Sequence, residues 1–311
     1  MKISVVLTTY NGKSYIWELL ESIARQSAKA DEVVIIDDVS TDGTEKIIKK
    51  FIKENELDWK VYINDTNIGW RKNFRIALRR ASGDLVFLCD QDDMWDREKI
   101  ELMKNVMESH KKIKLLASNY SVINEGAYEL SYRFRIDPSC WVDNGTISKF
   151  DSIKCITNVL RPGCTYCVRK DLIHMMDIYD DDDLGHDNVL WHLAYASSSL
   201  YLLNRKLIKY RLHKGHTSEY NEKRTKKRRT DEIEGAIRVG KFLKNVCVNE
   251  GYGTLENVEC MIEFQKKRKY LIEKGSIGEL LKFQLENRKL YFRITSIVMD
   301  IYSKKIEKLL L

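Results

Sequence analysis

The stretch "GDLVFLCDQDDMW", residues 83–95, is a short apolar run that ends in a cluster of acidic side chains. Residues 84–88 have the length and composition of a buried strand. Asp90, Asp92 and Asp93 follow it closely. Carboxylates held this near one another repel and raise each other's pKa. Such a cluster is therefore costly unless water, hydrogen-bond donors or a cation neutralise it.

Strand-like runs of this kind alternate with helical patterns through the first hundred residues. The helical patterns place apolar residues at positions i, i+3, i+4 and i+7, first at Ile16, Leu19, Leu20 and Ile23. The other predicted strands are residues 3–8, 32–37 and 59–64. This alternation predicts an α/β fold with parallel strands, and ligands of such sheets bind outside the carboxyl ends of the strands.

The turn after the first strand, "TTYNG", argues against a dinucleotide fold. It holds one glycine, Gly12, and lacks the GxGxxG pattern that brings backbone amides to a pyrophosphate. A divalent cation on the carboxylates of residues 90–93 is another way to hold a diphosphate, and Mg²⁺ or Mn²⁺ accepts such oxygen ligands. The alternative is a solvated acidic loop that caps the helix beginning near Arg97.

The composition is that of a globular protein with one or two domains. The chain has 311 residues, of which 43% are apolar and 32% are charged, with 2 prolines. Its apolar runs fall well short of the roughly 20 residues that cross a bilayer, and the N-terminal run is too short for a signal peptide. These features predict a cytoplasmic protein. The cysteine number, 7, is odd, and the Cys164-x-x-Cys167 pair has no second pair to complete a zinc site, which favours reduced structural thiols.

Basic charge is concentrated in the last third of the chain. From Asn204 onward there are 26 Lys and Arg against 14 Asp and Glu, whereas residues 1–203 hold 27 against 32. The basic segments have helical patterns with an apolar stripe, which suits either an anionic membrane surface or packing against the rest of the chain or another subunit. No nucleic-acid motif accompanies the basic residues 226–229, so nucleic-acid binding is not expected.

The chain resembles glycosyltransferase family 2, the inverting GT-A enzymes that use nucleotide-diphospho-sugars, and within it the rhamnosyltransferase-like branch. The motifs that carry the resemblance, in order across residues 3–218, are "SVVLTTYNG", "EVVIIDDVSTDGT", "NIGWRKNFRIAL", "GDLVFLCDQDDMW", "RPGCTYCVRK", "GHDNVLW" and "YRLHKGHTS". The resemblance implies a GT-A catalytic domain over residues 1–218, with a mixed sheet and helices on both faces. A basic, mainly helical extension over residues 219–311 would follow it.

The resemblance also implies a donor site for a dTDP- or UDP-sugar with a divalent cation, Mn²⁺ or Mg²⁺. In this site Asp38 would accept a hydrogen bond from the pyrimidine N3–H, a charge-assisted bond, and the ring of Tyr10 would stack on the base. The other implied donor residues are Thr8 in the base pocket, Asn67, Gly69 and Lys72 in a nucleotide-contacting turn, and Asp92 on the ribose side. Asp93 would ligate the metal, and Asp90 could exchange roles with either Asp92 or Asp93. His213 would lie near the metal or the diphosphate.

On the acceptor side, the resemblance places Gly163, Cys164 and Thr165 on the cleft wall and makes Asp187 the general base. The implied reaction is a single in-line displacement that moves a sugar, rhamnose among the candidates, to a hydroxyl of a cell-surface glycan or lipid-linked saccharide. Two other functions stay open: a sugar-phosphate nucleotidyltransferase and a catalytically inactive scaffold that binds sugar nucleotides. A homo-oligomer and contact with the inner face of the membrane are also expectations.

Overall fold

The computed structural model describes residues 1–130, 138–179, 181–213, 226–291 and 293–309. The chain divides into two compact units. Unit 1 contains residues 1–150, 160–194 and 198–216, and unit 2 contains residues 151–159, 195–197 and 217–311. The predicted boundary at 218/219 lies outside the described residues. Segments 151–159 and 195–197 join the C-terminal unit although no change in composition marks them.

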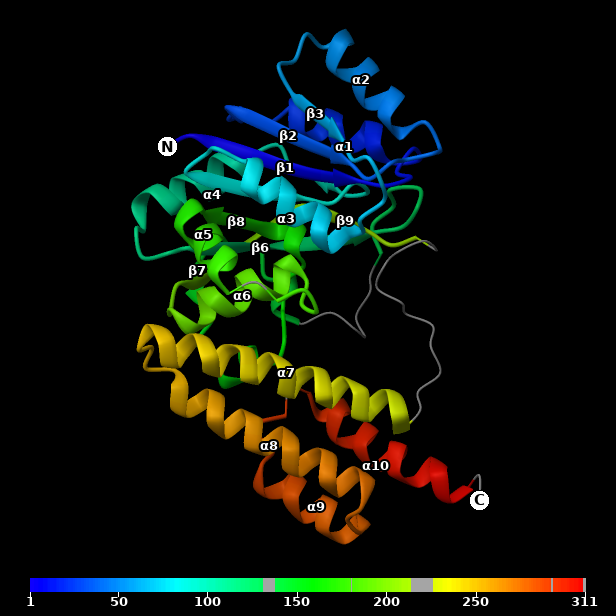
Figure 1. The fold of residues 1–311 in the computed structure, drawn as a ribbon, viewed down its shortest axis with the longest axis vertical. Helices are drawn as coiled ribbons and strands as arrows, with labels where there is room; N and C mark the ends of the chain where they lie inside the picture. Colours follow the sequence, from blue (N-terminus) through cyan, green and yellow to red (C-terminus); the bar gives the residue numbers. More distant parts are fainter. Residues whose placement is uncertain (131–137, 180, 214–225, 292, 310–311) are drawn as a thin grey trace. The chain divides into compact units, whose positions relative to one another are not determined.

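Unit 1 is built on a nine-stranded mixed sheet (Figure 1). Its strands are β1 (Ile3–Thr9), β2 (Glu32–Asp37), β3 (Lys60–Ile63), β4 (Leu85–Cys89), β5 (Met94–Trp95), β6 (Leu115–Ile123), β7 (Ile147–Lys149), β8 (Tyr166–Arg169) and β9 (Leu200–Arg211). They lie in the order β3-β2-β1-β4-β8-β6-β9-β5, with β7 pairing β9. The first four are parallel, and β8 then runs antiparallel to both β4 and β6. The ends of the four predicted strands differ from these by one residue at most.

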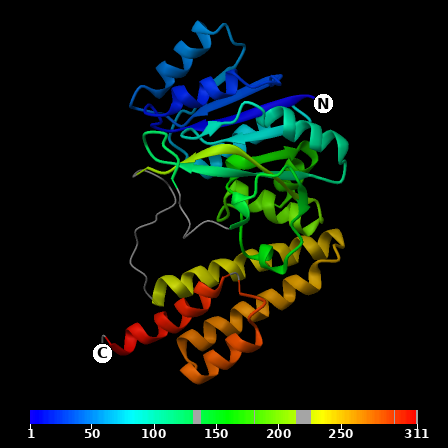
Figure 2. The same ribbon diagram turned by 180° about the vertical axis from the view of Figure 1, so that it is seen from behind.

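Helices cover both faces of this sheet. They are α1 (Ile16–Ala24), α2 (Thr44–Glu54), α3 (Trp70–Arg80), α4 (Lys99–Ser109), α5 (Lys170–Ile178) and α6 (His186–Ala196). Val5 and Leu7 of β1 share one buried cluster with apolar residues of α1, α2 and α4, because alternate residues of a strand point to one face. Helix α3 contacts β1 and β2, and α3, α5 and α6 lie on the face seen in Figure 1, with α1 and α4 on the face seen in Figure 2.

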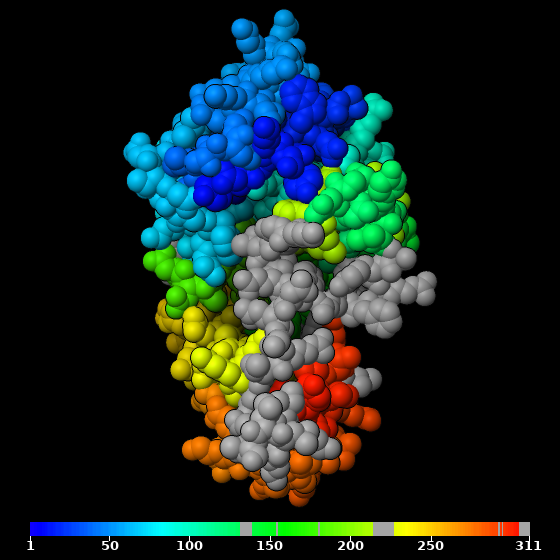
Figure 3. Space-filling view, turned by 90° about the vertical axis from the view of Figure 1, so that its right-hand side faces the viewer, coloured from blue at the N-terminus to red at the C-terminus, as the bar shows by residue number. Residues whose placement is uncertain are grey.

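Unit 2 is helical in its described part, with α7 (Lys226–Glu250), α8 (Leu255–Glu273), α9 (Ile277–Glu286), α10 (Ile294–Leu309) and the short 3-10 helix η2 (Ile153–Ile156). Helices α7 to α10 carry the yellow to red colours in Figure 3. Within the described residues, no helix combines the length and apolar content needed to span a bilayer.

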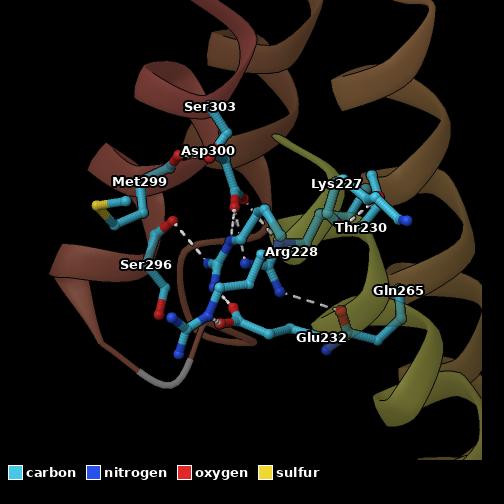
Figure 4. Close-up of polar contacts among 11 residues, drawn as sticks. Lys227, Arg228, Thr230, Glu232, Gln265, Ser296, Met299, Asp300 and Ser303 are labelled. Atoms are coloured by element: carbon cyan, nitrogen blue, oxygen red, sulfur yellow. Dashed lines mark hydrogen bonds and ion pairs between the residues drawn. The ribbon is translucent and has the colours of Figure 1, made fainter. Parts of the chain in front are cut away.

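A buried ion network joins three helices of unit 2 (Figure 4). The Asp300 carboxylate of α10 is fully buried and accepts hydrogen bonds from Arg268 of α8, at 2.7 and 2.9 Å, and from Arg229 of α7, at 2.7 Å. Arg229 also donates to Glu232 at 2.7 Å. The shared carboxylate therefore fixes the position of α10 against α7 and α8.

Candidate functional site

The carboxyl ends of β1 and β4 are tied together by an amide side chain. Gln91 accepts a hydrogen bond from the Tyr10 N–H at 2.9 Å and donates one to the Tyr10 carbonyl at 3.0 Å. A Cβ atom at Gly12 would lie 2.3 Å from Gln91 Oε1, so the glycine makes room for this contact. The Tyr10 side chain is 48% exposed and Thr8 is buried in β1. Gln91 was not predicted as a site residue, although it lies inside the acidic motif.

Asp38, at the end of β2, organises the turn that precedes α3. Its Oδ1 accepts hydrogen bonds from Ile68 N at 2.9 Å and Asn64 Nδ2 at 2.8 Å, and its Oδ2 accepts one from Gly69 N at 2.8 Å. Asn67 donates to the Asp38 carbonyl at 3.1 Å. The predicted donor residues 38, 67 and 69 are thus brought together. The carboxylate is only 2% exposed and has three protein donors, so its bond to a pyrimidine base stays a prediction.

Asp92 and His213 meet at the end of β9. His213 Nε2 lies 2.8 Å from Asp92 Oδ2, and both side chains are partly exposed. Buried Arg211 fixes this region, because its Nε donates to the Asp92 carbonyl at 2.8 Å and its backbone N–H donates to Asp93 Oδ1 at 3.0 Å. The Asp92 carboxylate is an oxygen ligand of the kind that Mg²⁺ and Mn²⁺ prefer, and the His213 imidazole lies within hydrogen-bonding distance of it. Arg211 was missed by the sequence analysis.

Asp90, Asp93 and Cys164 form a second group, called here the thiol cluster. Their ligating atoms all lie within 4.8 Å of one another. Burial, together with the charges of Asp92 and Asp187, raises the pKa of Asp90 to about 7. Burial and the charges of Asp92 and Asp90 also raise the pKa of Asp93 well above its usual range. Without a cation, burial therefore favours the protonated, uncharged form of these two carboxyl groups.

A buried lysine lies behind the thiol cluster. Lys99 Nζ donates to the Cys164 carbonyl at 2.6 Å and lies 3.8 Å from the centroid of the Trp95 ring. Burial lowers the pKa of Lys99 to about 8, although the nearby thiols and Asp93 act in the opposite direction. This lysine fixes the η3 turn (Gly163–Thr165) that carries Cys164. It was not predicted as a site residue.

Asp187 lies in the first turn of α6 and packs against the chain at Gly163 and at Gly185. A Cβ at Gly163 would lie 3.1 Å from Asp187 Cβ, and a Cβ at Gly185 would lie 2.6 Å from Asp187 Oδ1 and 3.0 Å from the Trp70 ring. The negative charge of Asp187 acts on Asp90. The structure therefore brings the predicted base, the predicted acceptor-side turn and the acidic motif together.

The residue before the predicted base has an unusual environment. The His186 ring stacks on Phe74 with centroids 3.9 Å apart. Burial lowers the pKa of His186 to about 4, so the ring is neutral at pH 7. Its Nδ1 has no hydrogen-bond partner among the described residues. The ring therefore packs as an uncharged aromatic surface that fixes the start of α6 against α3.

The remaining predicted residues differ in their exposure. Lys72 is exposed on the first turn of α3. Gly163, Cys164 and Thr165 are all buried, and the Thr165 hydroxyl donates to the Pro162 carbonyl at 2.7 Å. Their contribution to an acceptor cleft stays a prediction, and it would come from the shape of the turn.

Solved structures share this fold. The structure of Staphylococcus aureus TarS residues 1–349 in complex with UDP-GlcNAc superposes with a TM-score of 0.65 over 97% of this chain and 82% of that one, at 23% identity. The structure of the same TarS segment in complex with UDP superposes with a TM-score of 0.60. This likeness confirms the predicted GT-A fold class.

Curated relatives are similar to this chain in sequence. The poly(ribitol-phosphate) beta-N-acetylglucosaminyltransferase TarS of S. aureus (strain Mu50) is 35% identical over 136 residues, which are 43% of this chain and 23% of TarS. The putative teichuronic acid biosynthesis glycosyltransferase TuaG of Bacillus subtilis (strain 168) is 29% identical over 226 residues, 72% of this chain and 84% of TuaG. The matched part of this chain thus spans about a quarter of the length of TarS but most of TuaG.

The family model agrees with these relatives over more than half of the chain. The model of glycosyl transferase family 2 matches residues 4–174, from β1 to α5. The predicted enzyme class, a glycosyltransferase, is confirmed. The chain belongs to glycosyl transferase family 2.

Proposed function

We propose that this chain is an inverting, metal-dependent transferase that moves a sugar from a pyrimidine nucleotide-diphospho-sugar to a hydroxyl of a cell-surface glycan. One observation carries the proposal: Asp187, Asp90 and the Gly163 turn converge at the edge of the sheet where α/β proteins bind ligands. The TarS structure with UDP-GlcNAc supports a UDP-sugar as the first donor to test, beside dTDP-sugars and rhamnose.

In the proposed reaction, Asp187 accepts the proton of the acceptor hydroxyl as that oxygen attacks the anomeric carbon. The new bond joins the acceptor oxygen to the anomeric carbon, while the bond from that carbon to the diphosphate oxygen breaks and the nucleoside diphosphate leaves. Attack from the face opposite the leaving group inverts the anomeric configuration. A positioned general base contributes about 10² to 10⁴ in rate.

We assign the divalent cation of the donor to Asp92 and His213. The His213 Nε2 and Asp92 Oδ2 atoms lie 2.8 Å apart in a partly exposed position, and Mn²⁺ or Mg²⁺ binds a carboxylate such as that of Asp92 together with substrate phosphates. When bound, the ion offsets the negative charge that develops on the diphosphate. The sequence favoured Asp93 for this role. That role of Asp93 stays a prediction; its side chain is buried, and one carboxylate oxygen accepts a hydrogen bond from the Arg211 N–H.

Thermal unfolding with nucleotides tests the donor site. UDP, dTDP, GDP and CMP would be added to the full chain, each with and without Mn²⁺. We expect stabilisation by UDP or dTDP that depends on Mn²⁺, about 2.7 kcal/mol at 100 times the dissociation constant. Asp92→Asn should remove it, whereas Asp58→Asn, at an exposed position away from the site motifs, should not. A chain that no nucleotide stabilises would favour the scaffold function.

Transfer assays test the reaction itself. Purified chain with UDP- and dTDP-sugars and a panel of glycan or lipid-linked acceptors should release the nucleoside diphosphate. The anomeric configuration of the product, read by NMR coupling constants, should be opposite to that of the donor. Retention of configuration would overturn the single-displacement mechanism, even if transfer occurs.

A lipid-linked acceptor would make membrane contact by the C-terminal helices useful, and we include this contact in the proposal. Helix α9 exposes Leu281 and Leu285, the latter to 76%, and α10 exposes Val298 and Tyr302, while Lys282 is also exposed. Exposed apolar side chains beside basic ones suit an anionic bilayer surface. Sedimentation with phosphatidylglycerol vesicles should be salt-sensitive and reduced by Leu285→Glu. Concentration-dependent self-association without vesicle binding would point to a homo-oligomer instead.

A further inference from the structure

Trp70 is a large apolar side chain that stays exposed at the ligand-binding edge of the sheet. It is the first residue of α3, which follows β3, so it stands at the carboxyl end of the parallel strands. The residue is 41% exposed. A single exposed apolar side chain is common on proteins and needs no explanation by itself. Trp70 differs from such side chains because it lies next to two parts of the candidate site.

The backbone at Trp70 is joined to the turn that Asp38 organises. Gly69, directly before Trp70 in the chain, donates its N–H to Asp38 Oδ2 at 2.8 Å. The N–H of Ile68 donates to the other oxygen of the same carboxylate at 2.9 Å. The backbone that carries the indole is therefore fixed to the predicted donor site.

The indole itself lies beside the predicted base. A Cβ atom at Gly185 would lie 2.6 Å from Asp187 Oδ1 and 3.0 Å from Cη2 of the Trp70 ring. Both side chains thus approach the same point, so the six-membered ring of the indole is a neighbour of the carboxylate. Asp187 is half-buried, and its Oδ1 accepts the Asn188 N–H at 2.8 Å. We therefore assign the acceptor's proton to Oδ2.

Other aromatic and cationic groups hold the indole in place. The His186 ring meets it edge to face, with centroids 6.0 Å apart and an interplanar angle of 77°. His186 in turn stacks on Phe74, with centroids 3.9 Å apart. The guanidinium carbon of Arg71 lies over the indole, 4.7 Å from its centroid. A side chain held in this way loses less conformational freedom when a ligand binds.

A fixed, exposed indole beside a base suits the two-sided character of a pyranose ring. The axial C–H groups of a pyranose gather on its faces and pack against an aromatic surface, whereas its hydroxyls lie around the rim and form hydrogen bonds. An acyclic polyol is flexible and has no such permanent apolar face. A carboxylate that meets one hydroxyl, next to an aromatic surface that meets carbon, therefore selects a cyclic saccharide.

We propose that Trp70 determines acceptor specificity, because its indole packs against the C–H face of a pyranose ring whose reacting hydroxyl meets the Asp187 carboxylate. The acceptor is then a cyclic saccharide and not an acyclic polyol. This assignment rests on the proposed function, since it takes Asp187 as the base. It adds the chemical class of the acceptor and the residue that recognises it.

The first experiment measures saccharide binding to the full chain by saturation-transfer NMR, with and without UDP and Mn²⁺. The probes are the methyl glycosides of β-glucose, β-galactose, β-N-acetylglucosamine and α-L-rhamnose, with glucitol and ribitol as acyclic controls. We expect at least one pyranoside to receive saturation, most strongly at the protons of one ring face, and neither polyol to do so. Saturation of no pyranoside, or equal saturation of the polyols, overturns the proposal.

Paired variants identify the indole that makes the contact. Trp70→Leu should weaken binding of that pyranoside by about 5-fold, the factor that corresponds to about 1 kcal/mol of aromatic contact. Trp70→Phe keeps an aromatic surface and should bind more tightly than Trp70→Leu. Trp17→Leu is the matched control, because Trp17 is 39% exposed and packs against Phe51 on α2. Equal affinities of Trp70→Leu and the wild type contradict the assignment.

Nucleotide binding and kinetics separate this inference from the proposed function. The Asp38 bonds involve backbone N–H groups, so Trp70→Leu should keep the Mn²⁺-dependent thermal shift with UDP or dTDP. In transfer assays it should raise KM for the acceptor about 5-fold and leave KM for the donor unchanged. Loss of the nucleotide shift in Trp70→Leu would show that the indole supports the donor turn instead, which overturns the acceptor role.

The two proposals also fail in different ways. A wild-type chain that nucleotides stabilise, but that binds no pyranoside, keeps its donor site and loses the role given to Trp70. A chain that binds a pyranoside through Trp70, but that no nucleotide stabilises, keeps the saccharide site and loses the transferase reaction.

Discussion

Gln91 and Tyr10 exchange two hydrogen bonds, 2.9 and 3.0 Å long, between an amide side chain and a peptide group. The contact joins the acidic loop after β4 to the loop after β1. The predicted base-stacking residue and the predicted metal-binding loop are therefore held at a fixed spacing. A ligand that touches both loops would find them already positioned.

Removing this contact should loosen the two loops. Gln91→Ala loses both hydrogen bonds, so we expect the free energy of unfolding to fall by about 1 kcal/mol and nucleotide binding to weaken. Urea unfolding and the nucleotide thermal shift check the two effects. Asn55→Ala, which removes an exposed side chain that donates to the Phe51 carbonyl of its own helix, is the control for losing a surface amide.

Gly12 offers a double-mutant test of the same contact. Gly12→Ala places a Cβ 2.3 Å from Gln91 Oε1, so it should destabilise the wild-type chain, by about 1 to 3 kcal/mol as in other overpacked sites. In a Gln91→Ala background this clash is absent, so Gly12→Ala should lower the free energy of unfolding by a smaller amount. Equal costs in both backgrounds would show that Gly12 is needed for another reason.

Asp187→Asn should separate binding from chemistry. The substitution keeps the size of the side chain but removes the base, so we expect kcat to fall by about 10² to 10⁴ while the nucleotide-induced thermal shift remains. Asp183→Asn, at an exposed position in the preceding acidic loop, should keep normal rates. Transfer by Asp187→Asn at near wild-type rates would remove Asp187 from the mechanism.

Glu32 should make the fold sensitive to acid. Burial would raise the pKa of Glu32, but hydrogen bonds from Ser4, Ser82 and Lys60 outweigh it and lower the pKa to about 2. A carboxylate with a lowered pKa stabilises the fold fully above its unfolded pKa of about 4.3, and this stabilisation is lost as pH falls through the folded pKa of about 2. The shift corresponds to roughly 3 kcal/mol.

Glu32→Gln measures this contribution. At pH 7 the variant should be less stable than the wild type by about 3 kcal/mol, and the difference should shrink steadily between pH 4.5 and 2. Unfolding by urea at a series of pH values gives the comparison. Glu21→Gln, at the surface, controls for general acid effects. A difference that stays constant with pH would mean that Glu32 acts through packing and not through its charge.

Asp300→Ala should destabilise unit 2 strongly, because it leaves the buried guanidinium of Arg268 and the mostly buried one of Arg229 without their shared carboxylate. Breaking one side of a buried ion pair costs about 3 to 5 kcal/mol. Glu232→Gln removes the more exposed partner of Arg229 and should cost less than about 1 kcal/mol. Hydrogen exchange in α7, α8 and α10 would show where the protection is lost.

The parallel half of the sheet could be predicted because each strand and helix leaves a local pattern of apolar residues. The second half could not. Strand β8 runs antiparallel to β4 and β6, and Leu115 of β6 pairs with both Val168 and Leu200, an arrangement that no alternation of strands and helices in the sequence reports. The bulge near Asn119 in the β6 and β9 pairing is equally invisible in a single sequence.

Prediction of the candidate site from the sequence was limited in the same way. Its acidic residues were found because they cluster after a strand, whereas buried Lys99 and Arg211 resemble ordinary surface charges in the sequence. Lys99 left one signal: it stands four residues before buried Met103, on the apolar face of α4. Cys164 was assigned to a cleft wall, and its place beside Asp90 and Asp93 follows from the contact of η3 with β4, which only the fold reveals.

The membership of residues 151–159 in unit 2 has a consequence for the order of folding. The η2 segment contacts α7 and α8, which begin about seventy and about one hundred residues later in the chain. As a chain emerges from the ribosome N-terminus first, the buried side chains of Cys155 and Ile156 must wait for those helices to be synthesised. If the chain ended directly after β9, residues 151–159 would lack the helices that they contact. The minimal transferase that folds alone should therefore include the C-terminal helices.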